Sequence, residues 1–129
     1  MKGFLLAVDD FKSIQIVISS IFSQDFDVVR KPNGKEALAW LFEGNIPDLI
    51  ITDLQMPEMC GFEFISNLKS NQVFKGVPIV VLSGKDDSSE RIKCYKLGVN
   101  EFITKPFSPE ELRIRCLNLL ERNPSALPH

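Results

Sequence analysis

The sequence is poor in the residues that build disulfide frameworks, zinc sites and histidine-based catalysis. Its cysteines are Cys60, Cys94 and Cys116, and its one histidine, His129, is the last residue. An odd number of cysteines without metal-type spacing argues against a disulfide framework and against a zinc site. This cysteine usage fits a reducing cytoplasm. We interpret His129 as a tail residue and not as a catalytic base.

The sequence also lacks a strong charge of one sign and long hydrophobic runs. The net charge is −2, with no long basic run, so the electrostatic footprint of a duplex-binding protein is absent. No apolar stretch is long enough to cross a bilayer, and the N-terminus enters a strand pattern without the features of a signal peptide. We therefore expect a cytoplasmic protein that binds neither nucleic acid nor membrane directly.

What the chain does contain is a fivefold alternation of short apolar runs and amphipathic segments. The apolar runs predict strands at about residues 3–8, 26–31, 49–52, 77–82 and 102–104. The segment after the first strand predicts a helix with one apolar face, made of Phe11, Ile14, Val17, Ile18, Ile21 and Phe22. Asn33, Asp87 and Ser108 are the expected N-caps of three later helices.

Strands that are apolar on both faces and alternate with helices predict a parallel sheet covered on both sides. Right-handed crossovers then favour a doubly wound α/β fold, for which we expect the flavodoxin-like (βα)5 strand order 2-1-3-4-5. The 129 residues suit one domain, predicted over residues 1–122, with 123–129 as a linker or disordered tail.

Four of the apolar runs stop at residues that can perform phosphate chemistry: Asp9-Asp10, Asp53, Ser83 and Lys105. Parallel strands end at one edge of the sheet, where α/β folds place their sites. Three carboxylates there would raise one another's pKa, and a hard divalent cation such as Mg²⁺ relieves this repulsion. A carboxylate beside such a cation can attack a phosphoryl group. Lys105 would then supply a positive charge to the phosphoryl oxygens, and Ser83 would supply a hydrogen-bond donor.

The motifs around these residues are Val8-Asp9-Asp10, Asp53 followed by Met56-Pro57 and Gly61, Ser83-Gly84, and Lys105-Pro106-Phe107. In these motifs the chain resembles the receiver domain of response regulators from bacterial two-component signalling, over about residues 3–122. The resemblance implies a phosphorelay module that catalyses only its own phosphorylation and dephosphorylation. It also implies a phosphohistidine donor on a sensor histidine kinase or a histidine phosphotransfer protein.

The resemblance assigns the acidic residues their roles. Asp53 would be the phosphoacceptor, and it would bind Mg²⁺ or Mn²⁺ together with Asp10. Asp9 would assist the metal, often through water, and the backbone carbonyl of Gln55 would be a further ligand. Two different functions stay open beside this one, a receiver-like interaction module that works without phosphate and an Asp-nucleophile phosphatase. The phosphatase needs a second Asp where this chain has Gln55, which cannot transfer a proton.

The remaining roles concern phosphate binding and the switch. By the same resemblance, Ser83 and Lys105 would bind the phosphoryl group, Gly84 would leave the pocket open, and the bond before Pro106 would be cis. Ser83 and Phe102 would form the switch, with Phe102 in place of the Tyr found in many members. Without a hydroxyl, its outward state lacks a side-chain hydrogen bond, so we predict a looser two-state switch.

Two apolar residues of the last predicted helix, Ile114 and Leu117, fall off its core-facing stripe. In the family the surface made by the fourth helix, fifth strand and fifth helix contacts partners, so we expect Ile114 and Leu117 to contribute to a homodimer or to an output-domain contact. The resemblance leaves two arrangements open. The chain is either a stand-alone receiver or the N-terminal receiver of a longer regulator with a C-terminal effector domain.

Overall fold

The computed structural model describes residues 2–122, which form a five-stranded parallel sheet with five helices. The strands are β1 (Gly3–Val8), β2 (Phe26–Lys31), β3 (Leu49–Thr52), β4 (Ile79–Ser83) and β5 (Glu101–Thr104). The helices are α1 (Lys12–Phe22), α2 (Gly34–Phe42), α3 (Gly61–Lys69), α4 (Ser88–Leu97) and α5 (Pro109–Arg122). The sheet order is β2-β1-β3-β4-β5, which confirms the predicted doubly wound fold. The expected tail, 123–129 with His129, lies outside the described residues.

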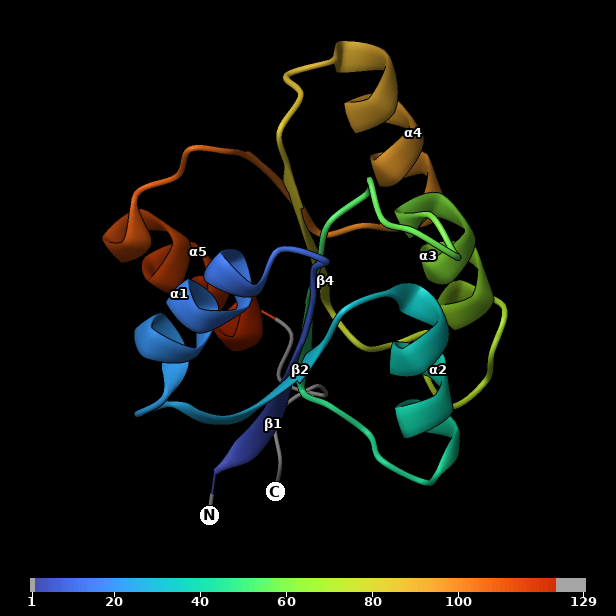
Figure 1. Ribbon diagram of the computed structural model, residues 1–129, viewed down its shortest axis with the longest axis horizontal. Coiled ribbons are helices and arrows are strands. Elements are labelled where there is room, and N and C mark those ends of the chain that lie inside the picture. Colours follow the sequence, from blue (N-terminus) through green and yellow to red (C-terminus); the bar gives the residue numbers. More distant parts are fainter. Residues whose placement is uncertain (1, 123–129) are drawn as a thin grey trace.

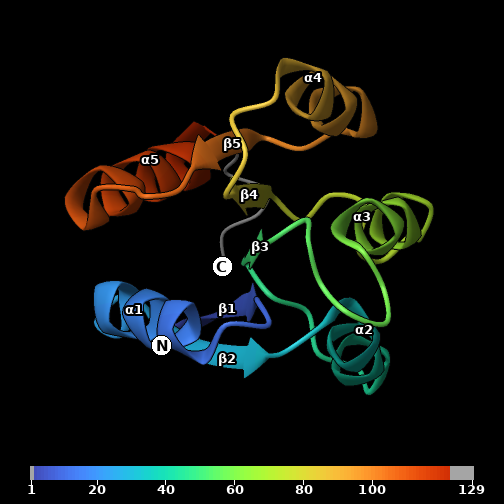
Figure 2. The same cartoon turned by 45° about the horizontal axis from the view of Figure 1, so that its top comes forward.

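The sheet is covered on both faces, and the alternation of side chains along each strand produces two separate cores. Figures 1 and 2 show α1 and α5 on one face and α2, α3 and α4 on the other. Along β1, Leu5 and Ala7 join the core under α1 and α5, whereas Leu6 and Val8 join the core under α2, α3 and α4. Because both faces are buried, the strands read as continuous apolar runs in the sequence.

Three helices begin at the residues that the sequence indicates. The side chain of Asn33 accepts a hydrogen bond from the backbone N–H of Glu36, and Asp87 caps α4 in the same way. The Ser108 hydroxyl accepts the N–H of Glu111 at the start of α5. Each cap satisfies a backbone donor that the first helical turn leaves unpaired.

The fourth strand begins and ends later than predicted, at Ile79 and Ser83 instead of Val77 and Leu82. Pro78 lacks a backbone donor, and pairing with β5 extends to the partners Ser83 and Thr104. Ser83 is therefore the last residue of β4 and is fully buried.

The three cysteines are free thiols at separate places in the fold, Cys60 exposed and the other two buried. Burial raises the pKa of Cys94 to about 11 and that of Cys116 to about 12, so both stay protonated at neutral pH. No helix within residues 2–122 has the length and apolar character needed to cross a bilayer.

Gly61, the first residue of α3, packs directly against the loop that carries Asp53. Its N–H donates to the carbonyl oxygen of Leu54, at 2.8 Å. A Cβ atom at position 61 would lie 2.5 Å from the carbonyl oxygen of Asp53 and 2.6 Å from the Cα of Leu54. These neighbours are backbone atoms, which cannot rotate away, so glycine is required here by packing.

We predict that Gly61→Ala lowers the free energy of unfolding by about 1–3 kcal/mol, the usual cost of overpacking a tight contact. Urea denaturation measures the change. Gly76→Ala is the matched control, because a Cβ there meets no atom within 4 Å. Equal stability of the two variants would contradict the packing argument.

Candidate functional site

Three carboxylates gather at the carboxyl ends of β1 and β3. Asp9, Asp10 and Asp53 each offer one oxygen atom, and these atoms lie within 4.8 Å of one another. Asp9 and Asp53 are buried, whereas Asp10 is exposed. Backbone hydrogen bonds fix this arrangement, since the N–H of Asp53 donates to the carbonyl of Val8 at 3.0 Å.

The ammonium group of Lys105, just beyond β5, lies between the two buried carboxylates. Its Nζ atom is 3.0 Å from Oδ2 of Asp9 and 3.5 Å from Oδ2 of Asp53. Its backbone N–H donates to the carbonyl of Ser83, which joins this strand end to that of β4. The bond to Pro106 is cis, as the resemblance implies.

Burial raises the pKa of Asp9 above its ordinary value. The hydrogen bond from the N–H of Phe11 and the interactions with Lys105 act in the opposite direction, and the charge of Asp53 adds to the increase. The desolvation of this carboxylate is therefore only partly offset by its neighbours.

The carboxylate of Asp53 is oriented by its own loop. Its Oδ1 atom accepts the N–H of Leu54 at 2.7 Å and that of Gln55 at 3.4 Å, whereas Oδ2 faces Lys105. The hydroxyl of Thr52 donates to the carbonyl oxygen of Asp53, which further fixes the backbone. One oxygen is thus held by backbone and the other faces the ammonium group.

A cavity of about 370 Å³ opens above Asp53. It is lined by Phe11, Ser13, Ile14, Asp53, Gln55, Gly84, Lys85 and Lys105. Gly84 lines this cavity, and a Cβ atom there would meet no protein atom within 4 Å, so packing does not require glycine at this position. The buried hydroxyl of Ser83 accepts the N–H of Lys85, at 3.2 Å.

The carboxylate set suits a hard divalent cation, because Mg²⁺ and Mn²⁺ favour oxygen ligands and several acidic groups are already within reach of one point. Asp10 is the exposed member, while Asp9 is engaged by Lys105. Gln55 lies in the same loop as Asp53, two residues further along the chain, and lines the cavity. The residues present therefore fit a metal site at this edge.

The ring of Phe102 is buried among the core residues under α4, with 7% of its surface exposed. The guanidinium of Arg91 lies over the ring, 5.4 Å from its centroid, and pairs with Asp86 in the β4–α4 loop. The N–H of Phe102 donates to the hydroxyl of Tyr95, at 3.3 Å. Sequence reasoning missed these α4 contacts, which connect the ring to the loop that follows Ser83.

The two off-stripe residues of α5 differ in their surroundings. Ile114 is exposed, with 48% of its surface accessible, opposite the buried stripe of the helix. Leu117 is half-buried and packs against the core under α1 and α5. It lies one turn after Arg113, whose guanidinium pairs with Asp25 beyond the end of α1. Leu117 therefore lies on the α1 side of the helix, away from β5, and of the two residues only Ile114 is exposed.

The expectation that Phe11 belongs to the buried face of the first helix is wrong. Phe11 is the N-cap residue of α1, and 59% of its surface is exposed. Val17 is also exposed, with 37% of its surface accessible, and the buried residues of the helix are Ile18 and Phe22. Phe11 directly follows the acid pair and precedes the first residue of the helix. This position indicates that Phe11 lies outside the helical repeat, which periodicity alone does not take into account.

The sequence matches the model of the response regulator receiver domain over residues 5–116. It is 35% identical to histidine kinase P4 of Formosa agariphila over 93% of this chain and 9% of the kinase. It is 34% identical to response regulator Rre1 of Synechocystis, over 92% of this chain and 52% of the regulator. The chain therefore spans about half of such regulators and a small part of such kinases.

Solved structures resemble the whole fold. The chemotaxis response regulator CheY4 of Vibrio cholerae matches with a TM-score of 0.83 and 30% identity, over 93% of this chain and 99% of that one. The BeF3-activated DrrB receiver domain matches with a TM-score of 0.84 and 25% identity, over 94% and 99%. The Mn(2+)-bound form of response regulator Rcp1 matches with a TM-score of 0.78 and 26% identity, over 92% of both.

The family model covers most of the chain, and the strand order and the acid cluster with Lys105 agree with it. The chain belongs to the response regulator receiver domain family of two-component signalling, a family of signalling modules and not of classical enzymes.

Proposed function

We propose that the protein accepts a phosphoryl group on Asp53 in a reaction that depends on Mg²⁺ or Mn²⁺. The donor is a phosphohistidine of a sensor histidine kinase or a histidine phosphotransfer protein. The observation that carries this proposal is the cluster of Asp9, Asp10 and Asp53 within 4.8 Å, with Lys105 between two of its members. Such a cluster holds a nucleophile, the ligands of a cation and a phosphate-binding ammonium at one cavity.

In the transfer, an oxygen of Asp53 forms a bond to phosphorus while the phosphorus–nitrogen bond to the donor imidazole breaks. The electron pair of that bond stays on the nitrogen, which takes up a proton as the imidazole leaves. Lys105 is close enough to Asp53 to exchange its carboxylate partner for an oxygen of the bound phosphoryl group. The hydroxyl of Ser83 is free to donate to another such oxygen, because in the structure it acts as an acceptor.

Asp10, Asp53 and the backbone carbonyl of Gln55 would hold the metal ion, with Asp9 assisting. When bound, the ion neutralises negative charge on the carboxylates and on the phosphoryl oxygens. The Mn(2+)-bound form of Rcp1, at 26% identity, supports a divalent cation in such a fold. The BeF3-activated DrrB domain supports activation of such a fold by a fluoride of beryllium.

The signal would leave through the α4–β5–α5 face, defined here as the outer surface of these three elements. Ser83 ends β4, and Phe102 in β5 contacts Arg91 and Tyr95 of α4. A movement of Ser83 toward the phosphoryl group would shift the balance between two arrangements of this set. The recipient of this signal is a C-terminal effector domain, a separate partner or a second copy of the chain. The protein acts in the cytoplasm.

We predict that Asp53→Asn abolishes phosphoryl uptake from acetyl phosphate with Mg²⁺, because an amide cannot act as the nucleophile. Intact mass spectrometry measures the adduct. Asp27→Asn is the control, since Asp27 is exposed on the edge strand β2. Uptake by Asp53→Asn at the wild-type rate would refute Asp53 as the acceptor.

We predict that Mg²⁺ raises the melting temperature of the protein, because a ligand of the folded state stabilises it by mass action. Asp10→Asn should weaken Mg²⁺ binding on the order of tenfold or more, since even the outer-shell partners of metal ligands are worth that much. This substitution leaves the Lys105–Asp9 pair intact. Calorimetric titration checks the affinity, and unchanged binding would remove Asp10 from the ligand set.

We predict that the beryllofluoride-loaded protein dimerises through the α4–β5–α5 face and that Ile114→Glu weakens this association about tenfold or more, because it would bury an unpaired charge. Sedimentation velocity at several concentrations measures the effect. Ile46→Glu alters a similarly exposed residue, with 56% of its surface accessible, before β3. The idea fails if both variants associate like the wild type.

A further inference from the structure

Phe11 breaks a local rule of helix formation. It occupies the N-cap of α1 with no side-chain hydrogen bond, at a position where Ser, Thr, Asp or Asn is preferred. Its ring is exposed, with 59% of its surface accessible, although Phe residues are usually buried. Neither feature follows the usual preference for its position. Departures from local rules without a structural gain are expected at functional sites.

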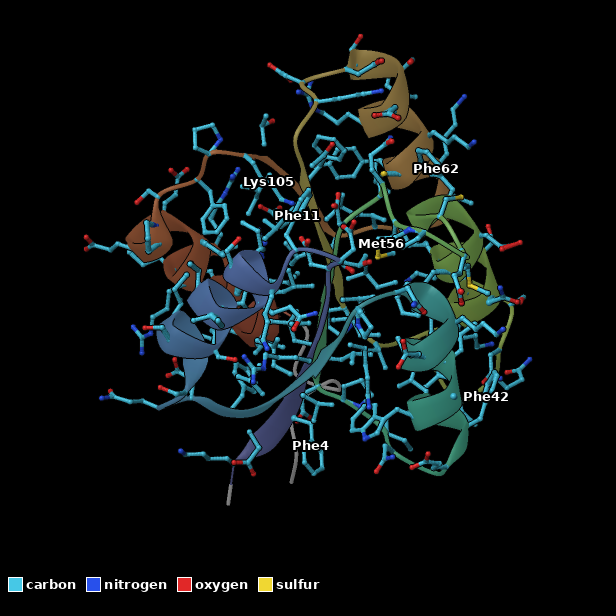
Figure 3. All side chains as sticks on the ribbon, in the orientation of Figure 1. Phe4, Phe11, Phe42, Met56, Phe62 and Lys105 are labelled. Atoms are coloured by element: carbon cyan, nitrogen blue, oxygen red, sulfur yellow. The ribbon has the colours of Figure 1, made fainter. Side chains whose placement is uncertain are left out.

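The ring belongs to the wall of the cavity above Asp53. Phe11 and Ile14, one helical turn apart, provide the apolar side of this cavity, and Lys85 provides a cationic side chain at its rim. The ring centroid of Phe11 lies 5.9 Å from Nζ of Lys105. Figure 3 shows Phe11 and Lys105 near each other, whereas Phe42 lies well away from both, on α2. The aromatic wall therefore stands beside the reacting groups.

A phosphoryl group alone gives no reason for an apolar wall, since its oxygens need charged and polar partners. The cavity of about 370 Å³ falls in the range of pockets that enclose small organic molecules, roughly 300–1,000 Å³. The part of a phosphohistidine that needs an apolar surface is its imidazole ring. A flat aromatic ring stacks favourably on Phe, and a protonated imidazole gains a cation–π attraction as well.

We propose that Phe11 is the residue that receives the donor's imidazole ring and thereby favours phosphoimidazole donors over donors without a ring. This inference rests on the proposed function, because it concerns the donor for Asp53. Within the bound donor, the ring of Phe11 touches only the leaving imidazole and not the phosphoryl group. It positions the imidazole so that the phosphorus–nitrogen bond breaks as the bond to Asp53 forms, and the imidazole nitrogen keeps the electron pair and gains a proton. Phe11 is thus a specificity residue and not the nucleophile.

The test compares two small donors that both transfer phosphate from nitrogen, phosphoimidazole with a ring and phosphoramidate without one. The rate of phosphoprotein formation is followed by intact mass at constant Mg²⁺ for each donor. In Phe11→Ala the rate with phosphoimidazole should fall about 3- to 10-fold, the range expected for one lost aromatic pair. The rate with phosphoramidate should change less than about twofold, because that donor has no ring to stack.

Three further variants make the result specific. Phe11→Trp should restore the preference for phosphoimidazole, whereas Phe11→Leu, which keeps apolar bulk without a ring, should not. Phe42→Ala removes an equally exposed ring, 63% accessible, at the end of α2 and should leave both rates unchanged. If Phe11→Ala folds poorly, Phe11→Leu still measures the effect of removing the ring on the rates with the two donors.

The outcomes separate this inference from the proposed function. If the wild type takes phosphate from both donors on Asp53 and Phe11→Ala slows both equally or neither, Phe11 is not a ring-binding residue and only this inference is overturned. If the wild type takes phosphate from neither donor, the proposed function is overturned and this inference with it. If Phe11→Ala lowers the rate of phosphorylation with phosphoimidazole only, and Phe11→Trp restores that rate, Phe11 is the residue that receives the imidazole ring.

Discussion

The close approach of three carboxylates at one edge of the sheet is the constraint on which the rest of the structure depends. Two of them are buried, and burial of a carboxylate is unfavourable unless a charge or hydrogen bond compensates it. Lys105 compensates Asp9 and Asp53 together, at 3.0 and 3.5 Å. Because this compensation is incomplete, the pKa of Asp9 stays raised. The excess negative charge at this edge favours binding of a cation. A bound cation would in turn offset the negative charge of a phosphoryl group there.

The fold holds this unfavourable cluster in place through its backbone. Parallel strands end side by side, and main-chain hydrogen bonds join the end of β1 to Asp53 and the end of β4 to Lys105. Gly61 allows α3 to approach the Asp53 loop within contact of its backbone. Two cores, one on each side of the sheet, pack against the strands that carry these ends. The positions of the three carboxylates therefore depend on backbone hydrogen bonds and on packing elsewhere in the fold, and not on contacts among the carboxylates themselves.

The sequence predicted the features that local chemistry determines and missed those that depend on neighbours distant in the chain. Apolar runs and turn residues sufficed for the alternation of strands and helices, and the rule of right-handed crossovers favoured the doubly wound order that the structure has. The caps at Asn33 and Ser108 followed from the hydrogen-bonding capacity of single side chains. Helical periodicity placed Phe11 in the core, because it ignores where a helix begins. Periodicity also does not show that Leu117 packs toward α1 or that Arg91 covers Phe102, since both are tertiary contacts.

Lys105 is central to the proposed phosphorylation, because it lies against both buried carboxylates and would exchange them for the phosphoryl group on Asp53. A crystal structure of the protein with Mg²⁺ and beryllofluoride tests this exchange most directly. We expect beryllofluoride on Asp53, the ammonium of Lys105 bonded to a fluorine, and a metal ion bound by Asp10. Beryllofluoride at another residue, or Lys105 bonded only to Asp9 and Asp53 as it is now, would contradict the exchange.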